Sequence, residues 1–190
     1  MLRGTSATAT VGTEIGGTDG RSAIGSHGGD RQAGGVAPRG GVPFRVLEHA
    51  PVYTSEEAAR IRATAPEAGA KALVVRAEER HVLLVLPGNR RADNARLRKM
   101  LGTRKLRFVT PEELLRLTGC VPGAVPPFGN LFGLPVLVDE ALTGCDEIAF
   151  NAGSNAVSIT MRCDDFVRLS GARTGRFVQA EGTAPPAGAG

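Results

Sequence analysis

The hydrophobic pattern of the chain is clearest in two apolar runs near its middle. These runs, 71–77 and 81–86, are rich in valine and leucine and are separated by the polar residues 78–80. Apolar runs of this length, bounded by a polar turn, are typical of neighbouring buried strands. The sequence therefore predicts a buried hairpin over residues 71–86.

Helix start signals lie on both sides of this hairpin. Thr54 is followed three residues later by Glu57, and Thr110 by Glu113 with a proline in between. In this pattern the threonine side chain and the glutamate side chain each accept a hydrogen bond from an otherwise unpaired amide at the helix start. We therefore expect helices that begin after both threonines, the second ending at Gly119.

The remaining pattern predicts shorter elements. They are a basic helix from Asp93 or Asn94 to Gly102, strands at 106–109, 136–138, 147–151 and 156–161, and a closing helix at 163–169. Residues 121–129 contain three prolines and two glycines, which excludes regular structure and favours a loop of fixed shape. This order of elements predicts a mixed sheet with helices packed outside it.

Both ends of the chain differ from its middle. The first forty residues contain eleven of the 26 glycines and show no apolar period. We expect a disordered glycine-rich arm over residues 1–42, one domain over 43–178 and a flexible tail over 179–190. No run approaches the ~18 apolar residues that a membrane span needs, so a membrane partner is not expected.

Several classes of chemistry are disfavoured by missing motifs. The three cysteines are odd in number and have no C-x-x-C spacing, which favours a reducing, cytoplasmic compartment. The three histidines form no H-E-x-x-H pattern, and the chain has neither a G-x-S-x-G elbow nor a phosphate-binding loop. We therefore predict no metal site and no cofactor.

Positive charge is concentrated in one segment, although the net charge is only +4. Eight basic residues occur within residues 90–107, with Asp93 as the one acidic residue among them: Arg90, Arg91, Arg96, Arg98, Lys99, Arg104, Lys105 and Arg107. A solvated helix face would explain such a cluster. A patch that contacts the phosphates of a nucleic acid would explain it equally.

Four segments, taken in order, resemble one known family. They are the H-x-P-V-x-T stretch at 49–54, Lys71 after Gly69 and Ala70, the Pro-Gly-Ala-Val-Pro-Pro-Phe-Gly loop from Pro122, and the Phe-Asn-Ala-Gly-Ser-Asn turn at 150–155. Together they resemble the YbaK/prolyl-tRNA-editing family over roughly residues 44–170. The resemblance implies an α/β (α+β) fold with a mixed, barrel-like β-sheet surrounded by helices. It also implies a trans-acting, metal-independent hydrolase that cleaves a noncognate amino acid from the terminal ribose of tRNA.

The resemblance also assigns candidate catalytic residues. The lysine of the family falls on Lys71, and its G-x-x-x-P-F motif falls on Gly123, Pro127 and Phe128. Ester hydrolysis requires stabilisation of an oxyanion, and we expect the amides of Gly123 and Ala124 to supply it. We expect Lys71 to position the substrate. The alternative for Lys71 is a lysine at a strand end that reaches solvent. The alternative for Gly123, Pro127 and Phe128 is an ordinary packed loop without a role in catalysis.

Further candidates concern substrate and tRNA binding. The substrate-binding candidates are Tyr53, Thr54, Pro127, Phe128, Asn151, Gly153, Ser154 and Asn155, and the tRNA-binding candidates are Arg90, Arg91, Arg96 and Lys99. Many family members that resemble this chain carry a histidine near the position of Asn155. This chain departs from that pattern. Because an amide can hydrogen-bond a small polar side chain, we expect small esters (Ala, Ser, Thr or Cys) to be preferred.

The expected partner is aminoacylated tRNA, with an aminoacyl-tRNA synthetase as a further candidate and the oligomeric state left open. A non-catalytic module of the same fold that binds tRNA or a synthetase is the main alternative. A small-molecule hydrolase is disfavoured by the missing triad and by the basic cluster, and it would depend little on tRNA or on salt.

Overall fold

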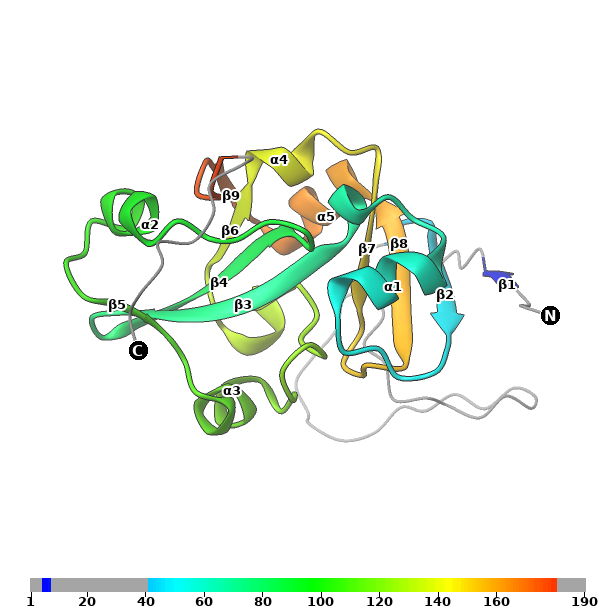
Figure 1. The fold of residues 1–190 in the computed structure, drawn as a ribbon, viewed down its shortest axis with the longest axis horizontal. Coiled ribbons are helices and arrows are strands. Elements are labelled where there is room, and N and C mark those ends of the chain that lie inside the picture. The colour runs from blue at the N-terminus through cyan, green and yellow to red at the C-terminus, as the bar shows by residue number, and fades with distance from the viewer. Residues whose placement is uncertain (1–4, 8–40, 181–190) are drawn as a thin grey trace, which may run out of the picture.

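The computed structural model describes residues 5–7 and 41–180, which form two β-sheets with helices around them (Figure 1). The first sheet is antiparallel, in the order β1-β2-β8-β7, and consists of β1 (Thr5–Ala7), β2 (Phe44–Glu48), β7 (Glu147–Asn151) and β8 (Val157–Arg162). The second is mixed, in the order β5-β3-β4-β6-β9, and consists of β3 (Ala70–Ala77), β4 (Arg80–Pro87), β5 (Leu106–Phe108), β6 (Val136–Asp139) and β9 (Arg173–Gly175).

The predicted hairpin is the centre of the second sheet. Strands β3 and β4 pair antiparallel from Ala70 opposite Pro87 to Ala77 opposite Arg80, as expected from their apolar runs. Leu83, Leu84 and Val85 of β4 are inaccessible to solvent. This burial on both faces explains why the run is continuously apolar instead of alternating.

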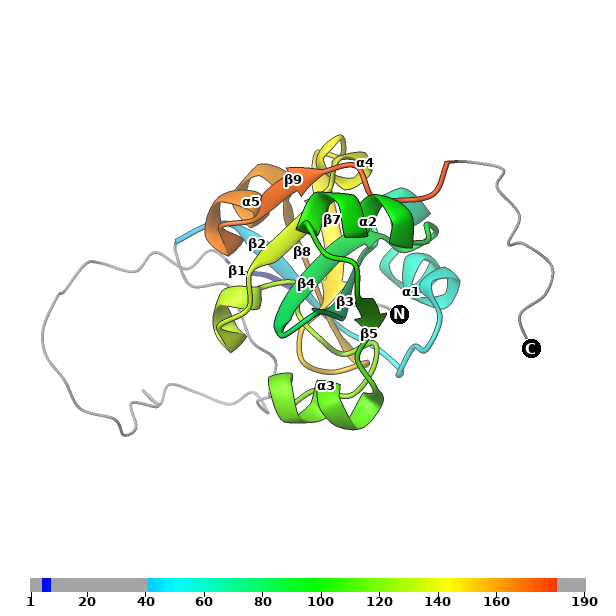
Figure 2. The same ribbon diagram turned by 90° about the vertical axis from the view of Figure 1, so that its left-hand side faces the viewer.

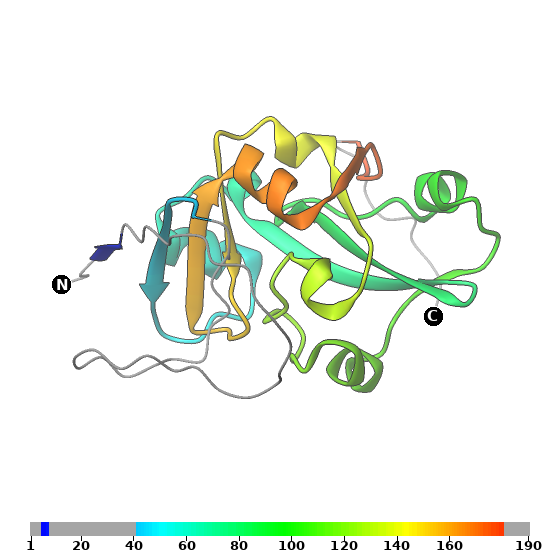
Figure 3. The same cartoon turned by 180° about the vertical axis from the view of Figure 1, so that it is seen from behind.

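The helices cover these sheets from several sides, as the end-on view in Figure 2 shows. They are α1 (Ser55–Arg62), α2 (Asn94–Leu101), α3 (Pro111–Thr118), α4 (Glu140–Thr143) and α5 (Cys163–Ser170), with short 3₁₀ turns at Pro66–Ala68 and Gly129–Phe132. The capping boxes predicted at Thr54 and Thr110 are both present. Helix α5, orange in Figure 3, lies on the face seen from behind and places Phe166 in the core.

The fold class is confirmed as mixed α and β, but the expectation of one barrel-like sheet is wrong. Two separate sheets are present, and an isolated parallel bridge between Gly69 and Ala149 joins them. Closure of a barrel needs a continuous ladder of hydrogen bonds around its circumference. Here the ladder between the β3 side and the β7 side is limited to that bridge.

The predicted arm and tail lie mostly outside the described residues. Within the segment 1–42, Thr5–Ala7 forms β1 and pairs antiparallel with β2, a strand that the apolar pattern did not indicate. Residues 1–4, 8–40 and 181–190 are outside the described part, so their disorder stays a prediction. Across 5–7 and 41–180, none of the helices is long and apolar enough to span a bilayer.

Candidate active site

A cavity of about 220 Å³ lies where the start of α1, the start of β3, the loop around Gly123 and the end of β7 come together. Five residues predicted from the sequence line it: Tyr53, Thr54, Lys71, Gly123 and Asn151. Arg62 and Gly88 also line it and were not predicted. Segments that are up to about a hundred residues apart in the sequence are thus brought to one cavity.

Lys71 is held at the cavity by the loop that follows β4. Its Nζ donates hydrogen bonds to the carbonyl oxygens of Gly88 at 3.0 Å and Arg90 at 2.5 Å. Burial lowers the pKa of Lys71, as does the nearby charge of Arg91, while Glu56 acts in the opposite direction. Since a lysine ammonium has three N–H donors, one N–H is left for a substrate.

Gly123 lies in a loop that lines the same cavity. Gly123 has φ +84°, a left-handed conformation that a residue with a side chain rarely adopts. Among the described residues, none accepts a hydrogen bond from its amide, whereas the amide of Ala124 donates to the carbonyl of Val121 at 3.1 Å. Gly123 therefore keeps the N–H expected of an oxyanion donor, and Ala124 does not.

Arg62 is a second cation at the cavity and lies at the end of α1. Its guanidinium donates from Nε to Ser158 Oγ at 2.8 Å, from Nη1 to the Ala149 carbonyl at 3.4 Å and from Nη2 to Asn151 Oδ1 at 2.5 Å. Burial lowers its pKa to about 10, so it is still charged at neutral pH. Its partners in the described structure are neutral groups, which leaves its charge uncompensated and two of its five N–H donors available.

Asn151 connects Arg62 to the Gly123 loop. While its Oδ1 accepts from Arg62, its Nδ2 donates to the Gly123 carbonyl at 2.7 Å and to Asn155 Oδ1 at 3.3 Å. The guanidinium thereby fixes the orientation of the amide, and the amide fixes the orientation of the Gly123 carbonyl.

His49 supports the same network from outside. Its Nδ1 lies 2.7 Å from the Ala50 carbonyl, and its Nε2 lies 2.7 Å from Ser158 Oγ. Because a carbonyl oxygen accepts and does not donate, Nδ1 donates to Ala50. The Ser158 hydroxyl donates to Asn151 Oδ1 at 3.4 Å. Contacts with His49, Arg62 and Asn151 together hold Ser158 in place, and its oxygen accepts from Arg62 Nε.

Tyr53 lies at the rim of the cavity with 79% of its surface exposed. Its backbone amide and that of Thr54 both donate to Glu57 Oε2, as part of the capping interactions that begin α1. The helix cap therefore fixes the backbone position of an exposed aromatic ring beside the cavity.

The other predicted substrate-binding residues do not line the cavity. Phe128 is only 5% exposed and packs edge-on against Phe150 and Phe166, and Pro127 is buried beside it. Three further candidates lie in the turn after β7: Gly153 donates to the Ala124 carbonyl, Ser154 Oγ accepts from Ala156, and Asn155 contacts Asn151. Their contacts connect that turn to the Gly123 loop.

The predicted tRNA-binding residues lie outside the cavity. Arg90 and Arg91 follow β4 and lie near Lys71, which donates to the Arg90 carbonyl and whose pKa the charge of Arg91 lowers. Arg96 and Lys99 lie on α2. Figure 1 shows α1 near one end of the β3–β4 hairpin and α2 toward the other. In the described part of the chain, no group of three or more His, Cys, Asp or Glu residues is arranged to hold a metal ion.

The mixed α/β fold thus contains a small cavity that is lined by two cationic side chains, Lys71 and Arg62, and by Gly123, whose amide has no acceptor among the described residues. The profile of the aminoacyl-tRNA editing domain family matches residues 49–169, and the chain belongs to this family. That match includes the whole cavity.

Three relatives agree with this assignment. The chain is 38% identical over 135 residues to the multifunctional Ser/Thr-tRNA deacylase ProXp-y of Escherichia coli K12, which covers 68% of this chain and 81% of that protein. It is 27% identical over 146 residues to the prolyl-tRNA editing protein ProX of Acetoanaerobium sticklandii, covering 74% of this chain and 89% of that protein. A crystal structure of a candidate trans-editing enzyme for prolyl-tRNA synthetase superimposes with a TM-score of 0.68 at 29% identity, covering 72% of this chain and 87% of that one.

Proposed function

We propose that this protein is a trans-acting aminoacyl-tRNA deacylase that hydrolyses the ester of tRNA mischarged with a small amino acid. The observation that carries the proposal is the set of unused donors around one cavity. These donors are an N–H of Lys71, two of Arg62 and the amide of Gly123. The three residues that carry these donors line the cavity, where we place the ester carbonyl and its ribose.

In the proposed reaction, water adds to the carbonyl carbon of the ester and the bond from that carbon to the ribose oxygen breaks. A proton from the water ends on that ribose oxygen, which becomes a hydroxyl, and the free amino acid leaves. The Gly123 amide stabilises the negative charge that develops on the carbonyl oxygen, a contribution of about 3 to 4 kcal/mol for one such donor in other enzymes. Lys71 and Arg62 hold the polar groups of the terminal adenosine, and a ribose hydroxyl assists the water.

The size and polarity of the cavity favour small esters. Its volume of about 220 Å³ must accommodate both the amino acid and part of the ribose. Thr54 lines it and supplies a hydroxyl near an amino-acid side chain, while Asn151, whose amide is engaged by Arg62, Gly123 and Asn155, forms a polar wall. We therefore propose Ser, Thr, Ala and Cys esters as the substrate class, in line with the name of the Escherichia coli relative.

The test is deacylation of tRNAs charged with Ala, Ser, Thr or Cys, with a metal chelator present. Lys71→Ala should lower the rate on the best ester by on the order of 100-fold, since a misplaced substrate loses most of the benefit of orientation. Arg168→Ala, which removes an exposed cation of α5 outside both the cavity lining and the basic segment 90–107, is the control and should retain the wild-type rate.

Two outcomes would sink the proposal. If the wild type cleaves none of these esters although it binds tRNA, the non-catalytic binding module is the better description. If it cleaves only esters of large apolar amino acids, the substrate class is wrong even though the deacylase reaction holds.

Two finer assignments accompany the proposal. We propose the cytoplasm as the compartment, because aminoacyl-tRNA is made and used there. We also propose association with an aminoacyl-tRNA synthetase, supported by the description of the structural relative as serving prolyl-tRNA synthetase. Co-elution of the purified proteins in size-exclusion chromatography tests the association, and separate elution at micromolar concentration would contradict it.

A further inference from the structure

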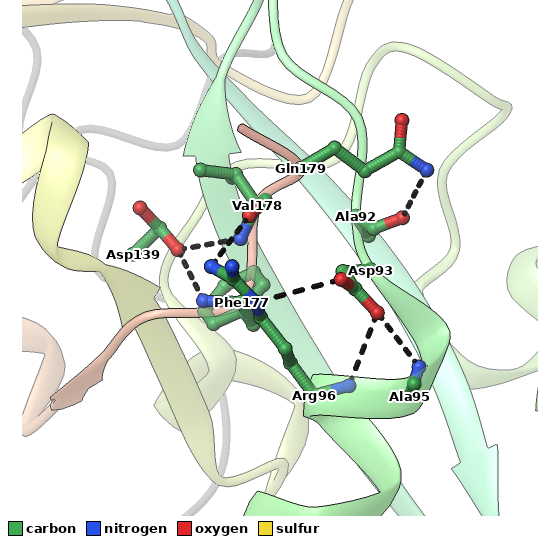
Figure 4. Close-up of polar contacts among 8 residues, drawn as sticks. All are labelled: Ala92, Asp93, Ala95, Arg96, Asp139, Phe177, Val178 and Gln179. Atoms are coloured by element: carbon green, nitrogen blue, oxygen red, sulfur yellow. Dashed lines mark hydrogen bonds and ion pairs between the residues drawn. The ribbon is translucent and has the colours of Figure 1, made fainter. Parts of the chain in front are cut away.

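Asp139 is a buried carboxylate, 1% exposed, that the proposed deacylation does not use. Its Oδ2 accepts hydrogen bonds from the amides of Phe177 at 2.6 Å and Val178 at 2.9 Å, and its Oδ1 accepts from Ala141 at 2.9 Å (Figure 4). Hydrogen bonds from N–H groups to a charged carboxylate are among the stronger ones in proteins. Asp139 therefore anchors residues 177–179, here called the C-terminal strap.

The strap lies against the segment that follows β4. The Asp93 amide donates to the Phe177 carbonyl at 2.6 Å, and the Gln179 amide donates to the Arg91 carbonyl at 2.9 Å. Arg96 also donates from Nη1 to the Val178 carbonyl at 3.2 Å. Phe177 is inaccessible to solvent, so its ring secures the strap in the core beneath this segment.

The same segment carries the two acceptors of Lys71. These are the carbonyl oxygens of Gly88 and Arg90, and the Arg90 carbonyl is only one residue before the Arg91 carbonyl that the strap holds. A shift of the peptide at Arg91 therefore moves the acceptor at Arg90. Residues 88–93 belong to no strand or helix, so their position depends on such individual contacts.

We infer that Asp139 and the C-terminal strap position Lys71, acting through residues 88–93. Asp139 is then a positioning residue, about seventy residues from Lys71 in the sequence, and the strap is a required part of the active site. The inference rests on the proposed function only for its effect on catalysis, because the effect on the Lys71 ammonium can be measured without any substrate.

Asp139→Asn in the full-length protein is the primary test. Both Asp139 oxygens accept from N–H groups, so the amide NH₂ of asparagine must face at least one backbone donor and loosens the strap. The readout is acetylation by a low dose of acetic anhydride, quantified by mass spectrometry at the three lysines of the chain, Lys71, Lys99 and Lys105. Lys71 should become several-fold more reactive, while the two exposed lysines stay unchanged as internal standards.

Two further variants separate positioning from general destabilisation. Thr110→Ala removes the cap of α3, away from the strap, and should destabilise the fold without changing the reactivity of Lys71. Arg96→Met removes a direct hydrogen bond to the strap and should raise the reactivity of Lys71 less than Asp139→Asn does. If Asp139→Asn fails to fold, the reactivity of Lys71 in Arg96→Met decides whether the strap positions Lys71.

Catalysis is tested by a double-mutant cycle between Asp139→Asn and Lys71→Ala. If Asp139 acts through Lys71, Asp139→Asn should lower the deacylation rate about tenfold in the wild type and hardly at all in the Lys71→Ala background. Additive losses, or unchanged Lys71 reactivity in both Asp139→Asn and Arg96→Met, would overturn the inference. Suppose Lys71 is more reactive in the two variants but the wild type deacylates none of the esters. The positioning role of the strap would then stand, and the proposed function would be refuted.

Discussion

At the residue scale, the shape of the Arg62 guanidinium determines how the polar groups around the cavity are held. Its three donor groups reach Ser158, Ala149 and Asn151 at the same time, an arrangement that needs the planar fork of a guanidinium. Arg62→Lys keeps the charge but loses at least two of these hydrogen bonds. Asn151 is then free to rotate away from the Gly123 loop.

We therefore expect Arg62→Lys to lower kcat of deacylation by about tenfold or more, in the range that follows small misplacements near a reacting group. Arg60→Lys is the matched control, because Arg60 is an exposed arginine on the same helix. Steady-state kinetics on the best ester checks this. Equal effects of the two substitutions would show that Arg62 contributes charge and not orientation.

The pH dependence of the reaction distinguishes two roles for Lys71. Its pKa is lowered, mainly by burial and further by Arg91, so the ammonium loses its proton at a lower pH than an ordinary lysine, whose pKa is about 10.4. If the ammonium positions the substrate, kcat/KM should fall as the pH rises through this lowered pKa. If a neutral lysine were the general base, kcat/KM would rise over the same interval. Rates must be corrected for spontaneous ester hydrolysis, and Lys71→Ala should lack the inflection.

At the element scale, α3 shows how a local sequence signal becomes a measurable property. Its capping box and an ion pair from Arg107 meet at Glu113, whose carboxylate accepts from both guanidinium Nη atoms at 2.6 Å and from the Thr110 amide at 2.9 Å. The Arg107 hydrogen bonds, followed by that of Thr110, lower the pKa of Glu113 to about 2. In an unfolded chain the pKa is about 4.3.

Since the folded-state pKa is the lower one, the stabilisation by Glu113 is complete above about pH 4.3 and is lost as the pH falls toward 2. We expect the urea midpoint of the wild type to decrease more steeply between pH 5 and 3 than that of Glu113→Gln. Arg107→Met should also reduce this slope, because it removes the largest cause of the shift. Identical slopes in all three proteins would contradict the assignment.

The elements predicted correctly are those whose signals are local. The caps at Thr54 and Thr110 and the β3–β4 hairpin each depend on residues close in sequence, so spacing and apolar runs were sufficient. Strand β9 was missed because Arg173–Gly175 has no apolar run and exists through parallel pairing with β6. Short helix α4 was missed for a similar reason, since it is stabilised by burial of Leu142 and by the cap from Asp139.

The same distinction applies within the candidate site. Lys71, Gly123 and Asn151 were found from motifs and do meet at the cavity. Arg62 was missed because an arginine in the last turn of an amphipathic helix is ordinary in sequence, and only its burial beside Asn151 makes it unusual. Phe128 was expected to contact substrate, but a phenylalanine after two prolines gives no indication of which way its ring points.

At the scale of the whole molecule, the cavity lies where the two sheets are joined. Gly69 immediately precedes β3 and bridges to Ala149 of β7, and the cavity-lining residues Lys71 and Asn151 follow these two positions in their strands. A single closed barrel would continue the ladder across this junction. The strand pairing that leaves it open depends on register between distant segments, which no local pattern in the sequence specifies.

We propose that the acceptor stem of tRNA runs along the β3–β4 hairpin. If the terminal adenosine enters the cavity, the acceptor stem must pass over a neighbouring surface, and the hairpin leads from the cavity toward the basic helix α2 (Figure 1). Arg96 already donates to the strap, whereas Lys99 is exposed in the last turn of α2. Lys99 is therefore the better reporter of a phosphate contact.

We expect Lys99→Ala to weaken tRNA binding and to reduce the slope of log K against log salt by about 0.7 to 0.9, the value for one lost phosphate contact. Arg168→Ala on α5 removes an exposed cation whose side chain is 61% accessible, and it serves as the control with an unchanged slope. Binding of uncharged tRNA, followed by fluorescence anisotropy between 50 and 300 mM salt, avoids any contribution from turnover. If Lys99→Ala and Arg168→Ala gave the same slope as the wild type, α2 would be a solvated helix face and the stem would leave the cavity in another direction.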